Sequence, residues 1–519
     1  MKEYAVPILN ARQSVSRRRV AVAVVACLLI LAGLVGLERD RRGISMADAT
    51  VGLTPVTLLQ RPGASGPGVL IAHGFAGSRQ FMDSFALTLV DAGYIVATYD
   101  LLGHGQNPAP MSGDVTTASG TTRLLVDEAA RVADWLSRQP GVTPGLALIG
   151  HSMASDIVIR LGQARGDVAA VVAVSMYSEA VTADSPRQLL ILTGQGEPHL
   201  RENALEALRM VDPEAQAGTT AASEGVQRRA AVAPWVGHVG VLYSDTSLTE
   251  ARDWIDAAFD RNHDGRVIST SAPLAALLVG LLALAWPLAG LVPLRNHSPQ
   301  ILGRWRYAGA ILIPVVAAPA VSALVPGTAL PILGGANLAA LLLVYGLAQL
   351  IVLRLSGLRL TRPDLIAAAG LTAFGILVFS AAMTNYAASF WPTGPRIGLF
   401  AVLLPGCFAL MCADALINDG GQAPWPRRLI SRIGIIVALA IGVATDVESL
   451  FMVSMMLPVL VLFFLVFGAM GRWVGLRAGP STSGLGLAVL LAWSLAATMP
   501  IFDQETESDF AALLSVQPV

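Results

Sequence analysis

The sequence predicts two kinds of structure in one chain: an α/β domain with a mostly parallel sheet and helices on both faces, and an all-α transmembrane bundle. Of the 519 residues, 54% are hydrophobic and only 14% are charged, which is far from a soluble composition. The apolarity is uneven. Residues 51–264 are mixed in composition, whereas residues 272–502 are a succession of long apolar blocks. A domain boundary near residues 266–271 follows.

The segment 51–262 has the pattern of a sheet covered by helices. Short apolar runs rich in β-branched side chains alternate there with amphipathic stretches, which is typical of a parallel sheet. We expect the inner strands at residues 68–72, 94–99, 146–149, 169–174 and 188–193. Functional side chains should then lie at the carboxyl ends of these strands.

Residues 20–37 form an unbroken apolar run that follows three arginines at positions 17–19. Its length approaches the ~20 residues that cross a bilayer. Glu38, Arg39 and Asp40 follow it, instead of the small residues of a cleavage site. We predict an uncleaved anchor after a cytoplasmic N-terminus at 1–19. A cleaved signal peptide and a lipoprotein signal at Cys27 are the alternatives.

About eight further spans are expected in the polytopic domain at 272–502, and the division near 446–449 is the least distinct. They are placed at 272–294, 307–325, 329–353, 364–385, 397–417, 432–446, 449–470 and 484–502. Arginines gather in alternate loops, which are retained in the cytoplasm. This topology puts residues 51–262 and the tail at 503–519 on the extracytoplasmic side of a cytoplasmic membrane.

Composition also limits the kinds of partner that we expect for this protein. A net charge of −1 gives no reason to expect a nucleic-acid partner. The single lysine, Lys2, in a chain rich in Ala, Gly and Arg indicates a bacterial source.

The three cysteines all lie in apolar blocks, so the globular segment has no disulfide. Charge within the spans is sparse, and Asp414 is explained best as a helix end at the membrane interface. The expected partners are an acyl substrate and the lipid bilayer, and the oligomeric state stays open.

The most informative stretch is Gly150-His151-Ser152-Met153-Ala154, between an apolar run and a helix-like stretch. A sharp strand-to-helix turn can hold a serine hydroxyl clear of the sheet, provided that the residues two before and two after it are small. Ser152 is therefore the candidate nucleophile. Ala154 departs from the glycine usual at that position.

Two more motifs follow the preceding predicted strands. His73-Gly74-Phe75 follows the first, and Asp100-Leu101-Leu102-Gly103-His104-Gly105 follows the second. In this order the three motifs resemble the α/β-hydrolase superfamily, and most closely its serine aminopeptidase, monoglyceride-lipase and dienelactone-hydrolase-like group. The resemblance covers residues 51–262 and leaves the membrane bundle unexplained.

The resemblance implies a triad in the chain order Ser, acid, His. The base would be His238, in a Gly-flanked loop before the last amphipathic stretch of the domain. The acid would be Glu197, just after the strand expected at 188–193, with Asp184 and Asp212 as alternatives.

The resemblance also implies an oxyanion hole made by the backbone N–H groups of Phe75 and Met153. The other motif residues would be structural: His73, Gly74, His104, Gly150, His151 and Ala154.

Only residues 175–187 separate two predicted strands where many relatives carry a cap domain. The missing cap favours an ester, thioester or lipid-like acyl substrate over a peptide. A serine peptidase of the same fold is the alternative. So is a membrane transporter or sensor whose hydrolase-like domain is catalytically idle.

No cofactor is expected. Asp260, Asn262 and Asp264 match the first half of a calcium loop, but Ser271 stands where the loop needs a bidentate acid. A simple Asp-Gly turn explains this stretch better.

Overall fold

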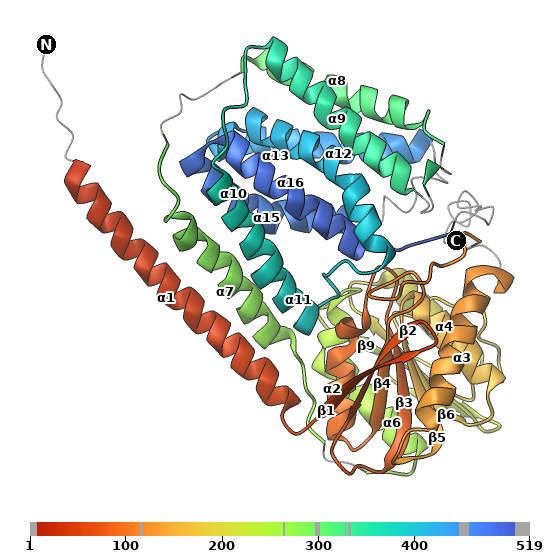
Figure 1. Ribbon diagram of the computed structural model, residues 1–519. Coiled ribbons are helices and arrows are strands. Elements are labelled where there is room, and N and C mark those ends of the chain that lie inside the picture. The colour runs from red at the N-terminus through yellow and green to blue at the C-terminus, as the bar shows by residue number, and fades with distance from the viewer. Residues whose placement is uncertain are drawn as a thin grey trace, which may run out of the picture. The chain divides into compact units, whose positions relative to one another are not determined.

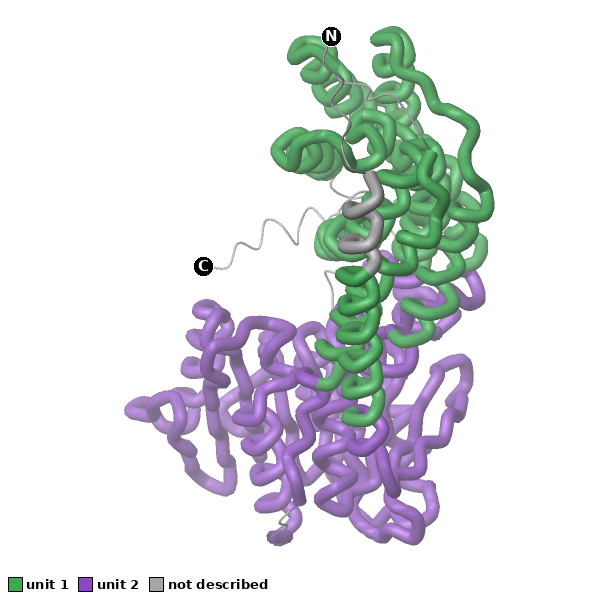
Figure 2. The backbone as a smooth tube through the Cα atoms, turned by 90° about the vertical axis from the view of Figure 1, so that its left-hand side faces the viewer, with its two compact units in different colours: residues 1–36, 273–382, 396–496 green, residues 37–272, 383–395, 497–519 purple. Residues whose placement is uncertain are grey.

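The computed structural model describes residues 8–114, 118–262, 265–295, 302–326, 329–330, 334–445 and 456–503. The division near 446–449, Asp264 and the tail after Asp503 lie outside these residues. Figure 1 shows the helices and strands, and Figure 2 colours two compact units separately. The helical unit is 1–36, 273–382 and 396–496, and the sheet unit is 37–272, 383–395 and 497–519.

Within its described residues, the sheet unit contains nine strands in the order β1-β2-β4-β3-β5-β6-β7-β9-β8 (Figure 1). The strands are β1 Ser45–Val51, β2 Thr54–Gln60, β3 Gly66–Ala72, β4 Ile95–Tyr99, β5 Val142–His151, β6 Val168–Val174, β7 Gln188–Gly194, β8 Thr220–Ser223 and β9 Val226–Ala233. Neighbours from β4 through β9 pair in parallel, while β1–β2, β2–β4 and β8–β9 pair in antiparallel fashion.

The register brings the carboxyl ends of the parallel strands to one edge. Ala72 at the end of β3 lies opposite both Tyr99 of β4 and Gly150 of β5. Gly194 at the end of β7 lies opposite Ala233 at the end of β9. The loops that follow these strands therefore meet along the same edge of the sheet.

Helices cover both faces of the sheet. Alternate strand residues face opposite sides. Val69 and Ile71 of β3 belong to the core formed with helices α2 (Asp83–Asp91) and α6 (Asp245–Ala258). Leu70 between them is fully buried outside that cluster, and α3 (Arg123–Ser137) and α4 (Met153–Ala164) pack against β5. Helix α5 (Pro198–Arg209) packs on β7 and β9.

The predicted fold class is confirmed, and the five expected strands are present with slightly different bounds. Strand β9 was not expected, because Gln227, Arg228 and Arg229 interrupt its apolar pattern. Arg228 is nevertheless fully buried, and its guanidinium donates to the carbonyl oxygen of Ala207 at 2.8 Å. That hydrogen bond lets a charged side chain occupy a strand interior.

Among the described residues, nine helices are long and apolar enough to cross a membrane. Their bounds are Arg17–Arg41 within α1 (Ile8–Arg41), α7 Ser271–Ala289, α8 Arg304–Ser322, α9 Gly335–Leu355, Leu365–Tyr386 (α10, η5 and α11), α12 Pro395–Ile417, α13 Trp425–Thr445, α15 Leu457–Ala478 and α16 Pro480–Thr498. Helix α13 begins seven residues before the predicted span. The prediction assigned Arg427, Arg428 and Arg432 to a loop, whereas they lie within the helix. Long arginine side chains can extend along a helix toward the interface, so they do not end it.

Asp414 lies in the helical unit near the end of α12, and it is buried. Its carboxylate pairs with Arg432 of α13 at 3.3 Å and accepts a hydrogen bond from Asn418 Nδ2 at 2.9 Å. Asp414 thus forms an ion pair between two helices, in which its own side chain is 8% exposed and that of Arg432 is 21% exposed.

Candidate active site

Ser152 occupies a strained turn between β5 and α4. Its φ of 54° and ψ of −121° are rare for a residue other than glycine, and such strain is typical of functional sites. A Cβ on Gly150 would collide with the carbonyl oxygen of Ala154, so position 150 requires glycine. Ala154 lies inside α4, where alanine fits. Its departure from the usual glycine therefore carries no conformational penalty.

The structure brings Ser152, His238 and Glu197 together from three separate loops. The Oγ atom of Ser152 lies 2.9 Å from His238 Nε2, and His238 Nδ1 lies 2.6 Å from Glu197 Oε1. His238 follows β9, Glu197 follows β7, and Ser152 follows β5. The three side chains form one continuous hydrogen-bonded chain at the carboxyl edge of the sheet.

Glu197 is held by more donors than His238 alone. Its Oε2 atom accepts the Gly194 N–H at 2.6 Å and the Ser175 hydroxyl at 3.0 Å, and its side chain is only 5% exposed. Burial raises the pKa of this carboxyl, but the hydrogen bonds from His238, Gly194 and Ser175 outweigh burial, and the net pKa is below its ordinary value. Glu197 therefore stays ionised beside the imidazole.

Ser175 was missed in the sequence. It directly follows β6, and its φ of 51° turns its hydroxyl toward Glu197. Its place at the carboxyl end of a parallel strand was the one available signal.

The two alternative acids lie elsewhere. Asp184 and Asp212 are both exposed. Asp184 accepts from Thr182 Oγ1 at 2.7 Å, and Asp212 accepts from the Glu214 N–H at 3.0 Å. Each carboxylate stabilises its own turn.

The loops that carry Glu197 and His238 are hydrogen-bonded to each other. The Gly196 N–H donates to Val236 O at 2.9 Å, and the Trp235 N–H donates to Gln195 Oε1 at 2.9 Å. A Cβ on Gly194 would lie 2.6 Å from Val236 O, so this close approach requires glycine. Trp235 itself has a φ of 62° and is 91% exposed beside the site.

His151 is buried under His238. Its Nε2 lies 2.9 Å from the carbonyl oxygen of His238, and burial lowers its pKa to about 4. The ring is therefore neutral at ordinary pH and supports the His238 loop. Gly74 packs on the same ring, because a Cβ there would lie 2.7 Å from His151 Nδ1 and 3.1 Å from the Ser152 Cβ.

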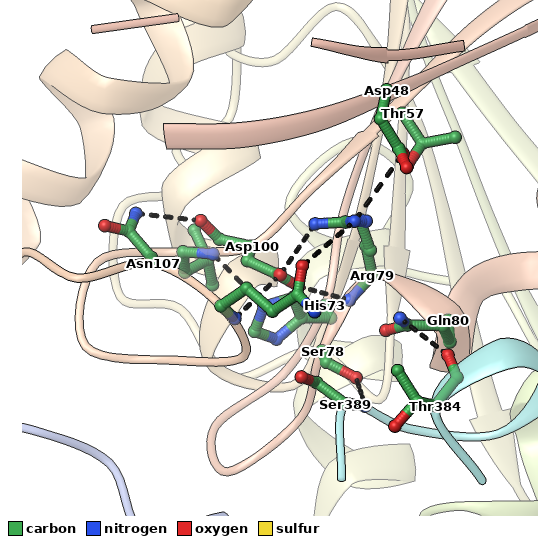
Figure 3. Close-up of polar contacts among 12 residues, drawn as sticks. Asp48, Thr57, His73, Ser78, Arg79, Gln80, Asp100, Asn107, Thr384 and Ser389 are labelled. Atoms are coloured by element: carbon green, nitrogen blue, oxygen red, sulfur yellow. Dashed lines mark hydrogen bonds and ion pairs between the residues drawn. The ribbon is translucent and has the colours of Figure 1, made fainter. Parts of the chain in front are cut away.

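The loop at residues 73–78 contains Phe75, which the resemblance implies as an oxyanion donor; we call it the oxyanion loop, and it is held at both ends (Figure 3). His73 is buried, which lowers its pKa, and its ring accepts the Leu101 N–H at 3.2 Å. At the other end Asp100 accepts the Arg79 N–H at 2.8 Å and pairs with the Arg79 guanidinium at 2.9 Å. Phe75 lies in the middle of this loop, and Met153 is the first residue of α4.

Glu128 of α3 holds the turn after β4 in place. This fully buried carboxylate accepts from Thr54 Oγ1 at 2.5 Å, from the Leu102 N–H at 2.9 Å and from Asn107 Nδ2 at 2.9 Å. Burial raises its pKa to about 7. Glu128 was not singled out in the sequence, because one glutamate in an amphipathic helix gives no signal.

Among the described residues, no three His, Cys, Asp or Glu side chains are grouped so as to hold a metal ion. Asp260 and Asn262 follow the end of α6, and Asp264 is outside the described residues. The preference for a simple Asp-Gly turn over a calcium loop stays an untested prediction. Residues 175–187, between β6 and β7, contain an isolated bridge from Thr182 to Ser185 and no helix or longer strand.

Residues 66–231 match the family model described as serine aminopeptidase, S33. An uncharacterized protein of Mycobacterium tuberculosis is 32% identical over 110 residues, which are 21% of this chain and 36% of that relative's length. Dienelactone hydrolase from Anabaena variabilis is 19% identical over 42% of this chain and 98% of its own, with a TM-score of 0.32. An epoxide hydrolase from Vigna radiata is 24% identical over 26% of this chain and 41% of its own, with a TM-score of 0.22.

Proposed function

We propose that the α/β-hydrolase domain of this chain is a serine hydrolase that acts on an ester, thioester or lipid-like acyl substrate. The observation that carries the proposal is the hydrogen-bonded chain from Ser152 through His238 to Glu197. A nucleophile, a base within reach of its proton and an acid that orients the base are the three parts that covalent acyl transfer needs.

In this mechanism Ser152 Oγ attacks the carbonyl carbon while His238 Nε2 takes its proton. Glu197 accepts the Nδ1–H bond, which fixes the imidazole tautomer and stabilises the imidazolium that forms. Collapse of the tetrahedral intermediate expels the alcohol, thiol or amine, which receives the proton from His238. Water, activated by the same imidazole, then attacks the acyl-enzyme and releases the acid.

The negative charge that develops on the carbonyl oxygen needs preorganised donors. We assign this role to the backbone N–H groups of Phe75 and Met153. Met153 begins α4, whose N-terminus favours negative charge. In comparable sites one such donor contributes about 3–4 kcal/mol to transition-state stabilisation.

The surroundings of His238 support an apolar substrate. Trp235 and Val239 flank it in sequence and are 91% and 53% exposed, and Tyr177, which hydrogen-bonds to Ser155 near the elbow, is 56% exposed. With only a short loop at 175–187, we expect these exposed side chains to form an open apolar rim. Such a rim suits the acyl chain of an amphiphile.

The S33 description of the matching family supports a second candidate, a serine peptidase. Hydrolysis of aminoacyl anilides compared with hydrolysis of acyl esters of matched length separates the two. Preferential turnover of the anilides would replace the esterase assignment.

We place the protein in a bacterial cytoplasmic membrane with the hydrolase domain outside. The nine apolar helices and the arginines of alternate connections support this placement. A single cysteine introduced at the exposed Leu53, with Cys27, Cys407 and Cys412 replaced, should react with a membrane-impermeant maleimide in intact cells. Reaction only after lysis would reverse the topology.

The decisive experiment is labelling by a fluorophosphonate probe. The full-length protein should be labelled and should hydrolyse acyl esters, and the Ser152→Ala variant should do neither. Ser137→Ala is the matched control, since the Ser137 hydroxyl donates to Ala133 O within its own helix, α3, at 3.0 Å. If the folded wild-type protein resists the probe and hydrolyses no acyl ester, the domain is an accessory module of a membrane transporter or sensor.

A further inference from the structure

Residues 384–390, which comprise the end of α11 (Ala381–Tyr386) and the start of its connection to α12, belong to the sheet unit and bond to the end of the oxyanion loop. The Ser389 N–H donates to Ser78 Oγ at 2.8 Å, and Gln80 Nε2 donates to Thr384 O at 3.0 Å (Figure 3). Ser78 and Ser389 are 2% and 4% exposed. The end of the loop is therefore bonded to a segment more than 300 residues later in the chain.

Residues 499–503, which follow α16, also belong to the sheet unit and lie against the turn after β4. The Ile501 N–H donates to Gly103 O at 2.9 Å, and the Met111 N–H donates to Ile501 O at 2.9 Å. Gly103 has a φ of 72°, and a Cβ there would lie 2.5 Å from Ile501 O. Because Gly103 has no side chain, residues 499–503 can pack directly against the backbone of this turn.

The same segment brings Phe502 to the middle of the oxyanion loop. Its ring is 1% exposed, and its centroid lies 6.3 Å from that of Phe75. The Phe75 ring also meets His104 edge-on at 5.2 Å. The Phe75 side chain is therefore held between the turn after β4 and the segment 499–503.

We propose that Phe502 and the Ser78–Ser389 hydrogen bond are positioning elements for the Phe75 N–H, a role that rests on the serine-hydrolase function proposed above. The oxyanion hole is then incomplete within residues 51–262. It is completed by two segments that the sequence places among the membrane spans.

The physical reason is the precision that an oxyanion hole requires. A catalytic donor must be held within ~0.5 Å of its productive position, and a misplacement of about 1 Å can cost a hundredfold in rate. Ala76 has a φ of 55°, so the backbone next to Phe75 is in a sparsely populated conformation. Such a conformation persists only when its surroundings fix it, and Phe502 and Ser389 supply contacts to Phe75 and Ser78.

The test uses full-length variants in detergent or nanodiscs. Phe502→Ala should lower kcat and kcat/KM by the same factor, roughly ten- to a hundredfold, with KM little changed. Affinity for a boronic acid that forms a tetrahedral adduct with Ser152 should fall by that factor too. Phe502→Leu, which retains most of the apolar volume, should restore most of the activity. Ser78→Ala should act like Phe502→Ala, and Ser78→Thr, which keeps the hydroxyl, should be close to the wild type.

The control is Phe259→Ala, which removes a ring of the same kind from the same unit. Phe259 packs on Tyr94 at 6.1 Å and touches Gly145 in the first half of β5, away from the carboxyl edge. It should lower thermal stability without changing kcat or boronate affinity. Unchanged kinetics in Phe502→Ala, with an active wild type, would refute the positioning role and leave the hydrolase function standing. A wild type that neither turns over esters nor reacts with a fluorophosphonate would refute both.

Discussion

His238 Nδ1 and Glu197 Oε1 lie 2.6 Å apart, and the other carboxylate oxygen of Glu197 already accepts two further hydrogen bonds. The glutamate therefore cannot rotate away from the imidazole without breaking its bonds to Gly194 and Ser175. This arrangement makes Glu197 an orienting group whose charge and position are both set by its neighbours.

Glu197→Gln should reduce kcat for a chromogenic acyl ester on the order of 10⁴-fold, because an amide in this place favours the wrong imidazole tautomer. Ser175→Ala should cause a smaller loss, since it removes only one of the bonds that keep the carboxylate ionised. Glu202→Gln, on the exposed face of α5, is the matched control and should leave kcat unchanged. Equal activity of Glu197→Gln and the wild type would exclude Glu197 as the orienting acid.

Gly150→Ala should abolish activity and lower the melting temperature. Its Cβ would collide with the backbone carbonyl of Ala154, which cannot move without displacing the start of α4 and with it Ser152. Gly166→Ala tests the same change where a Cβ meets no atom within 4 Å. It should leave kcat intact and stabilise the fold by about 0.4–1 kcal/mol, because alanine restricts the unfolded chain. Comparable losses in both variants would contradict the steric origin of the effect.

Local sequence signals predicted the parts of the site that lie next to strands. Ser152 was found from the apolar run before it and the small residues around it, and His238 from the family resemblance together with its glycine-flanked loop; the structure places them 2.9 Å apart. Strand β9 was missed because Arg228 is buried in it, and this burial is tolerable because the guanidinium donates hydrogen bonds to the carbonyl oxygens of Ala207, Thr182 and Ser185. The hydrophobic periodicity of the sequence does not reveal such hydrogen-bond partners.

The contacts of Phe502 and Ser389 are of a different kind. They join segments separated by hundreds of residues, and neither segment has a motif or a strand pattern of its own. Both were predicted as parts of the membrane region from their apolar neighbours. An apolar segment can be buried in lipid or in protein, and composition alone does not distinguish these environments.

Glu128 should make the stability of the fold depend on pH. Burial raises its pKa in the folded state to about 7 from an ordinary 4.5, so between these values the folded state binds the proton more tightly than the unfolded state. Stability should therefore decrease as pH rises through this window. Thermal unfolding measured across it should give a steeper decline for the wild type than for Glu128→Gln, whose amide does not titrate. The slope is the diagnostic quantity, because the amide also changes the hydrogen bonds to Thr54 and Leu102. Parallel slopes would show that another group carries the dependence.

Trp235→Ala should change substrate preference more than catalysis. The indole is 91% exposed, so its removal costs little packing, and it belongs to the apolar rim proposed above beside His238. If the rim holds the acyl chain, KM should rise for long-chain esters and stay nearly constant for acetyl esters, with kcat preserved for both. The control is Leu53→Ala, which removes a 63% exposed side chain between β1 and β2 and should leave both KM values unchanged. A uniform rise in KM for short and long esters would assign Trp235 to the structure of the His238 loop, and unchanged values would remove it from the substrate site.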